Sequence, residues 1–158
     1  VFIGRICTQE GIGKLLEVAR SLPEREFWIV GGGPFASFYL WRMPENIKNL
    51  GWQPHDKVAA ILRQARLCLI PREENALSPY STEKSVWKLN EYLTLGKMVV
   101  ASGVTAREER KNLKIVKPEE LVDAVRESLM HQPEKLLPED CRFWEGNEAA
   151  IREVYQSL

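Results

Sequence analysis

Two glutamates and a lysine form the group of residues best suited to chemistry. Glu83 and Glu91 are separated by seven residues, and Lys88 lies between them. Apolar Leu89 and Leu93 flank Glu91, which predicts a partly buried carboxylate that needs hydrogen-bond donors. A vicinal diol, such as that of a ribose, supplies two hydroxyl donors to the two carboxylate oxygens. The alternative is a solvated helix face, because two glutamates at this spacing are common by chance.

Lys88 has two interpretations of its own. It precedes Glu91 by three residues, so the two side chains can pair along a helix, which contributes roughly 0.2–0.5 kcal/mol. Alternatively, Lys88 meets a phosphate near the start of that helix, where the helix dipole also favours an anion.

Two further segments could approach an anion. Arg5 follows a predicted strand, and its charged, bidentate fork would suit a diphosphate, although any surface arginine could lie there. Gly31, Gly32 and Gly33 follow a second strand, where glycines let the backbone approach a ligand and leave N–H groups free. A tight turn after a buried strand explains the three glycines equally well.

These residues lie at the ends of short apolar runs that alternate with helical periodicity. Strands are predicted at residues 1–3, 27–30, 47–50, 67–70, 98–101 and 113–116. Helices are predicted at residues 12–22, 58–65, 84–95, 118–129 and 145–156. Residues 72–82 are predicted to form a long polar loop.

This alternation predicts a doubly wound, Rossmann-like α/β fold of about six parallel strands with helices on both faces. Ligands in such folds bind beyond the carboxyl ends of the strands. Arg5, the three glycines, the turn after Gly51 and the loop before Glu83 all lie at such ends, so the fold would gather them.

The composition sets limits on function. The 158 residues, one domain in length, carry 22 Lys plus Arg and 22 Asp plus Glu, without the basic excess typical of nucleic-acid binders. No apolar run approaches the roughly 20 residues that cross a bilayer. Three scattered cysteines and two histidines argue against a zinc site and favour free thiols in a reducing cytoplasm.

Together these pieces resemble the donor-binding domain of GT-B glycosyltransferases, specifically the group-1 family. The similarity follows the chain in order through six segments: "GR" at residues 4–5, "IVGGGP" at 29–34, "NIKNLG" at 46–51, residues 56–71, "EKSVWKLNEYLTLGKMVVAS" at 83–102, and an aromatic ending at 143–155. Each segment alone is weak, whereas six in order are specific.

The resemblance implies a role for each matching position. Arg5 would contact the donor diphosphate, Gly31, Gly32 and Gly33 would line the cleft, and the backbone around Trp52 and Gln53 would hold the base. Glu83 would be the catalytic residue facing the donor sugar, and Glu91 would bind the ribose. Such enzymes typically need neither metal nor cofactor. The nucleotide sugar is the substrate.

Three departures from the family pattern bear on these roles. Glu10 stands where the family carries a lysine, five residues after the arginine. Residues 84–86 replace a Gly-Phe-Gly segment, and Met98 replaces a proline. However, "KLNEYL" at residues 88–93 resembles a subset of GT-B enzymes in which the lysine binds phosphate, so Lys88 is expected to substitute for the lysine missing at position 10.

The resemblance implies a hexosyltransferase in which residues 1–158 bind the nucleotide sugar. An N-terminal acceptor domain would precede them in a longer protein, because residues 1–3 predict a strand already in progress. The full-length protein is expected to be cytoplasmic and could be peripheral at a membrane. The present chain would be inactive alone. Two alternatives stay open: a non-catalytic nucleotide-sugar binding module, and a UDP-sugar epimerase of GT-B type.

Overall fold

The computed structural model describes residues 1–76, 78–105, 107–137 and 140. Strands are β1 Phe2–Ile3, β2 Phe27–Val30, β3 Ile47–Asn49, β4 Leu67–Pro71, β5 Met98–Ser102 and β6 Leu113–Ile115. The α-helices are α1 Ile12–Ser21, α2 Ala36–Leu40, α3 His55–Gln64, α4 Trp87–Thr94 and α5 Leu121–Met130. Short 3-10 helices are η1 Thr8–Glu10, η2 Ser78–Tyr80 and η3 Pro118–Glu120.

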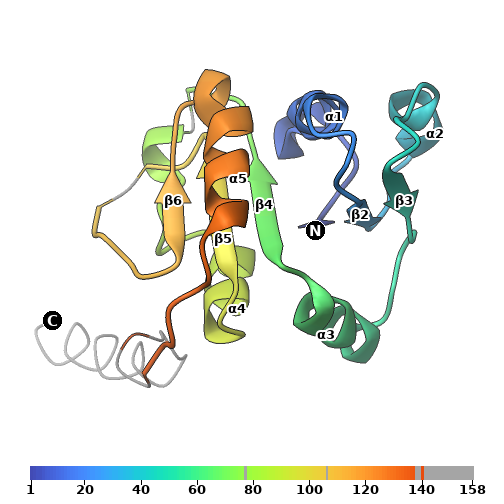
Figure 1. Ribbon diagram of the computed structural model, residues 1–158. Helices are drawn as coiled ribbons and strands as arrows, with labels where there is room; N and C mark the ends of the chain where they lie inside the picture. Colours follow the sequence, from blue (N-terminus) through green and yellow to red (C-terminus); the bar gives the residue numbers. More distant parts are fainter. Residues whose placement is uncertain (77, 106, 138–139, 141–158) are drawn as a thin grey trace, which may run out of the picture.

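The strands form two parallel groups, in the orders β1-β2-β3 and β4-β5-β6. The amide N–H of Leu69 in β4 donates a hydrogen bond of 2.8 Å to the carbonyl of Val1, just before β1. This bond places β1 beside β4, as Figure 1 shows. The carboxyl ends of β1 and β4 are therefore neighbours at the centre of the fold.

Alternate residues of β4 point to opposite faces, as the period of a strand requires. Leu67 and Leu69 pack into one core with α1 and α5, whereas Cys68 and Ile70 pack into a second core with α4 and Leu62 of α3. Helices thus cover both faces (Figure 1), which confirms the predicted doubly wound α/β fold. Burial raises the pKa of the Cys68 thiol to about 11, consistent with a packing role.

Glycine allows α1 to begin directly against the end of β4. Gly11 has a φ of 80°, and a Cβ built there would lie 1.6 Å from the carbonyl oxygen of Pro71. No other residue type fits that contact without displacing the backbone. The contact brings Glu10 and Arg72, the residues beside Gly11 and Pro71, next to each other.

Several element boundaries differ from the sequence prediction. Helix α4 begins at Trp87 and not near Lys84, because Thr82 and Ser85 form a local turn: the Ser85 hydroxyl accepts the Thr82 N–H at 2.8 Å. Such hydroxyl groups compete with the helical backbone. Helix α2 was not predicted, and the helix predicted at 145–156 lies outside the described residues. None of the described helices is both long enough and apolar enough to span a membrane.

Candidate functional site

A cavity of about 640 Å³ opens where the carboxyl ends of β1 and β4 meet the start of α4. Its walls carry four charged side chains: Arg5 and Glu10 from the segment after β1, Arg72 from the end of β4, and Lys88 from α4. Three of these are cationic and one is acidic. The cavity therefore carries a net positive charge of about two, which suits a polyanionic ligand.

Lys88 is held at the wall of this cavity by three contacts. Its ammonium group donates to the Glu10 carboxylate and to the Ile3 carbonyl at 3.3 Å, and it lies 5.6 Å from the centre of the Phe2 ring. Burial lowers the pKa of Lys88, while Glu10 opposes that shift. An ammonium group has three N–H donors, so one remains after these two hydrogen bonds.

Glu10 bridges two cations. Its Oε1 accepts a hydrogen bond of 2.9 Å from Nη2 of Arg72, and its Oε2 accepts one from Lys88. Burial alone would raise the pKa of Glu10, but Lys88 and Arg72 outweigh burial and hold the pKa below its ordinary value. The acidic residue at the family's lysine position is therefore part of an ion-pair network across the cavity wall.

Arg5 is the least constrained charged group of the cavity. Its side chain is exposed, and no hydrogen-bond or ion-pair partner is found for it among the described residues. Its guanidinium group lies at the cavity without a competing contact among the described residues. Whether it binds a diphosphate stays a prediction.

A second cavity, of about 630 Å³, lies between α3 and α4. Glu91 and Asn90 of α4 and His55 and Asp56 of α3 contribute its polar groups, and apolar side chains line most of the rest. The exposed indole of Trp87 lines both cavities. Because Lys88 and Glu91 lie on one helix, a single elongated ligand could contact both of them.

Glu91 is exposed, which agrees with the interpretation as a solvated helix face and not with a partly buried carboxylate. Residues two apart on an α-helix lie about 200° apart around its axis. Leu89 and Leu93, which are both buried, therefore point away from Glu91. Glu91 faces the second cavity with its carboxylate accessible, and its ribose-binding role stays a prediction.

Trp52 and Gln53 lie in the turn that leads into α3. The Trp52 side chain is exposed, and Nε2 of Gln53 donates a hydrogen bond of 2.6 Å to the Leu50 carbonyl. His55 and Asp56, which follow Gln53 after a single proline, line the second cavity. The structure thus places the predicted base-binding turn at the edge of the cavity that holds Glu91.

The glycines after β2 pack closely against the turn after β1, and their role in lining the cleft stays a prediction. A Cβ on Gly31, whose φ is 136°, would lie 1.9 Å from the Gly4 carbonyl oxygen, and one on Gly33 would lie 3.1 Å from that of Ile6. Gly32 accepts a hydrogen bond of 3.0 Å from the Ile6 N–H. None of the three glycines lines either cavity. They pack the turn after β2 against the turn after β1.

Glu83 departs furthest from its predicted placement. Its side chain is fully buried, and its Oε2 accepts a hydrogen bond of 2.9 Å from the Arg107 N–H. Its Oε1 is buried without a hydrogen-bond partner among the described residues. The side chain is buried and bound to the backbone that follows β5, so it is not accessible to a donor sugar in this structure. Its catalytic role stays a prediction.

Sequence reasoning missed Arg72 and Trp87. Arg72 directly follows β4, at a strand end where ligands bind in this fold, and that position was the signal that could have identified it. Trp87 is an aromatic residue at the first position of α4, and only the packing of α3 beside α4 shows that it separates two cavities.

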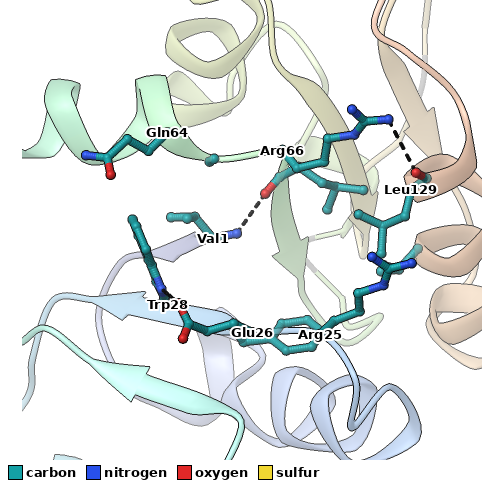
Figure 2. A pocket seen from close by; sticks show the side chains of 11 residues that line it. Val1, Arg25, Glu26, Trp28, Gln64, Arg66 and Leu129 are labelled. Atoms are coloured by element: carbon teal, nitrogen blue, oxygen red, sulfur yellow. Dashed lines mark hydrogen bonds between the residues drawn. The ribbon is translucent and has the colours of Figure 1, made fainter.

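Other parts of the described structure offer less. No group of three or more His, Cys, Asp or Glu side chains in residues 1–76, 78–105, 107–137 and 140 could hold a metal ion. A smaller cavity, of about 240 Å³, lies at the amino ends of the strands, between Trp28, Gln64 and Arg66 (Figure 2). That end of the sheet is opposite the charged cavity.

Comparison with protein families gives a match that covers most of the chain. Residues 1–131 match the family described as glycosyl transferases group 1. The chain belongs to this family. This confirms the resemblance inferred from the six sequence segments, five of which lie within the matched range. A comparison with curated proteins finds no significant match.

Solved structures with the same fold are distant in sequence. The C-terminal domain of LpcC, a glycosyl transferase group 1 family protein from Francisella tularensis, has a TM-score of 0.63 at 14% identity, covering 82% of this chain and 74% of that chain. AviGT4, a glycosyltransferase of avilamycin A biosynthesis, has a TM-score of 0.63 at 17% identity, covering 84% and 41%. Anabaena HepE, solved in complex with UDP, has a TM-score of 0.56 at 16% identity, covering 82% and 37%. The chain therefore spans less than half the length of AviGT4 and HepE.

Proposed function

We propose that this chain binds a nucleoside diphosphate sugar and serves as the donor half of a hexosyltransferase. The observation that carries the proposal is the placement of Lys88 and Glu91 on one turn of α4, each at one of two cavities that share Trp87. The first cavity has the cations that a diphosphate needs. The second has a carboxylate for a ribose and apolar walls for a base. HepE, a structure of the same fold, was solved with UDP.

The chemistry follows from the charge of the first cavity. Glycosyl transfer releases a nucleoside diphosphate, and negative charge develops on it as the bond to the sugar breaks. Glu10 holds Arg72 and Lys88 at the cavity wall, and Arg5 is exposed at the same cavity. Preorganised charges of the first kind stabilise a transition state without a metal ion. The acceptor would bind to a further domain of the full-length protein and approach the donor sugar from across the cleft.

A second candidate is a non-catalytic module that binds a nucleotide sugar. Two observations favour it. Glu10, an acidic residue of the charged cavity, stands where the family resemblance implies a lysine. The side chain of Glu83 is buried and does not line the charged cavity. Both candidates predict nucleotide binding. They differ in whether the full-length protein transfers a sugar.

A thermal-shift screen of this chain against UDP, GDP, ADP and their sugar esters tests nucleotide binding. A ligand at 100 times its dissociation constant adds about 2.7 kcal/mol of stability, which raises the Tm of a protein of this size by roughly 5–11 °C. The matched control is the corresponding nucleoside, which lacks phosphates and should produce a far smaller shift. If no nucleotide raises the Tm, the proposal is wrong.

Two assays with labelled nucleotide sugars separate the candidates. The full-length protein should transfer the sugar to an acceptor, whereas this chain alone should not. Binding without transfer by the full-length protein would favour the non-catalytic module. Turnover by the isolated chain would show that the chemistry needs no second domain.

A further inference from the structure

We propose that Glu10 is a built-in counter-ion that sets the charge of the donor cavity to match an intact nucleotide sugar and weakens binding of the released nucleoside diphosphate. This inference rests on the proposed function. It concerns the selectivity of the same site between substrate and product.

The Glu10 carboxylate is positioned between two cations of the cavity. Glu10 lies between Arg72 and Lys88 and accepts a hydrogen bond from each. The contact of Gly11 with Pro71 fixes this arrangement, because it places η1 against the end of β4. The backbone therefore holds the Glu10 carboxylate beside both cations.

The net charge of the cavity matches one ligand better than the other. Arg5, Arg72 and Lys88 contribute three positive charges to the cavity, and Glu10 removes one of them. A nucleotide sugar is a diphosphate diester with about two negative charges. A free nucleoside diphosphate gains a further charge because its terminal phosphate loses a second proton near pH 6. A cavity with two positive charges balances the first ligand and under-compensates the second.

The charge of Glu10 is close enough to the ligand to change its affinity substantially. One unit charge at roughly 6 Å, with an effective dielectric constant of roughly 40, changes the affinity for one extra ligand charge about tenfold. Product release limits the turnover of many enzymes, so a counter-ion of this strength would favour departure of the nucleoside diphosphate.

The experiment is a charge series measured by isothermal titration calorimetry at pH 8. The ligands are the nucleoside diphosphate selected by the thermal screen (UDP, GDP or ADP) and its glucose ester. Glu10→Gln should raise the ratio of diphosphate affinity to sugar-ester affinity about tenfold. Arg72→Gln should lower that ratio, and Glu10→Gln combined with Arg72→Gln should restore it. Glu17→Gln, on the exposed face of α1, is the matched control.

The outcomes distinguish this inference from the proposed function. If the ratio follows the net charge across the series, Glu10 acts as a counter-ion. If the variants bind nucleotides but the ratio stays constant, or the double variant behaves like Glu10→Gln, the inference is wrong and the proposed function stands. If the wild-type chain binds no nucleotide, both fall. Circular dichroism of each variant checks that the fold is retained.

Discussion

The ammonium group of Lys88 donates a hydrogen bond to the carboxylate of Glu10 across 78 residues of chain. The resemblance to the group-1 family implies a lysine at position 10, and the substitution of Lys88 for that lysine stays a prediction. The carboxylate of Glu10 also binds Arg72 at 2.9 Å. Within the charged cavity, the carboxylate of Glu10 is therefore the counter-ion of two cations, Arg72 and Lys88.

Replacing Lys88 by alanine should weaken nucleotide binding by roughly ten- to a hundredfold. A hydrogen bond to a charged group contributes about 1.5–3 kcal/mol, and Lys88 has an N–H donor available to the cavity. Isothermal titration calorimetry with the nucleoside diphosphate measures the change. Lys14→Ala, which breaks an exposed pair with Glu17 on α1, is the control and should bind as wild type does. Equal affinities for Lys88→Ala and wild type would rule out a phosphate contact.

Replacing Glu91 by alanine should remove the preference for a ribose over a deoxyribose. If the carboxylate accepts hydrogen bonds from the ribose hydroxyls, the wild-type chain should bind UDP about tenfold or more tightly than 2′-deoxy-UDP. The variant should bind both equally, and GDP or ADP with its deoxy form replaces UDP if the thermal screen selects another base. Because Glu91 is exposed, the Tm of the Glu91→Ala variant should stay within about 2 °C of the wild-type Tm. A preference that survives the substitution would place the ribose elsewhere.

Replacing Glu83 by glutamine should raise the Tm by about 2–8 °C. The amide oxygen can still accept the Arg107 N–H, and an amide costs about 1–2 kcal/mol less to bury than a carboxylate with one oxygen unsatisfied. Thermal unfolding measures the change, with the exposed Glu17→Gln as the control. A fall in Tm would instead show that the carboxylate is a structural anchor.

The ion pairs of Glu10 should make stability depend on pH in acid. Its pKa is lower in the folded chain than in the unfolded chain, so its contribution is present above about pH 4.5, the ordinary value. It is lost as the pH falls through the lowered folded pKa. The Tm of wild type should therefore exceed that of Glu10→Gln by a constant amount from pH 8 to pH 5, and the two Tm values should converge below about pH 4.5. Curves that stay parallel to pH 3 would contradict the ion-pair role.

The sequence was sufficient to predict the parallel strands, because buried strands in such sheets are nearly continuous apolar runs. Leu67 to Ile70 show this most clearly: the run predicts a strand, and both of its faces are buried. The start of α4 could not be predicted equally well. Thr82 and Ser85 have modest helix propensities, and only their mutual hydrogen bonds show that they form a turn before the helix.

The candidate site was predictable to a similar degree. Arg5, Lys88 and Glu91 reach the two cavities because each lies at a strand end or on the helix that follows one. The partners of Glu10 were not predictable, because its bonds to Arg72 and Lys88 join segments 62 and 78 residues apart. The burial of Glu83 also depends on Arg107, which follows a different strand.

The placement of Lys88 and Glu91 on one turn of α4 also limits how this site can change during evolution. Each residue inserted into an α-helix advances the following residues by 1.5 Å and rotates them by about 100°. An insertion or deletion between positions 88 and 91 would therefore turn Glu91 away from the second cavity while Lys88 stayed in the first. At the proposed nucleotide site, a change of base preference would therefore come from exchange of side chains around α4, while the length of that turn is expected to stay constant.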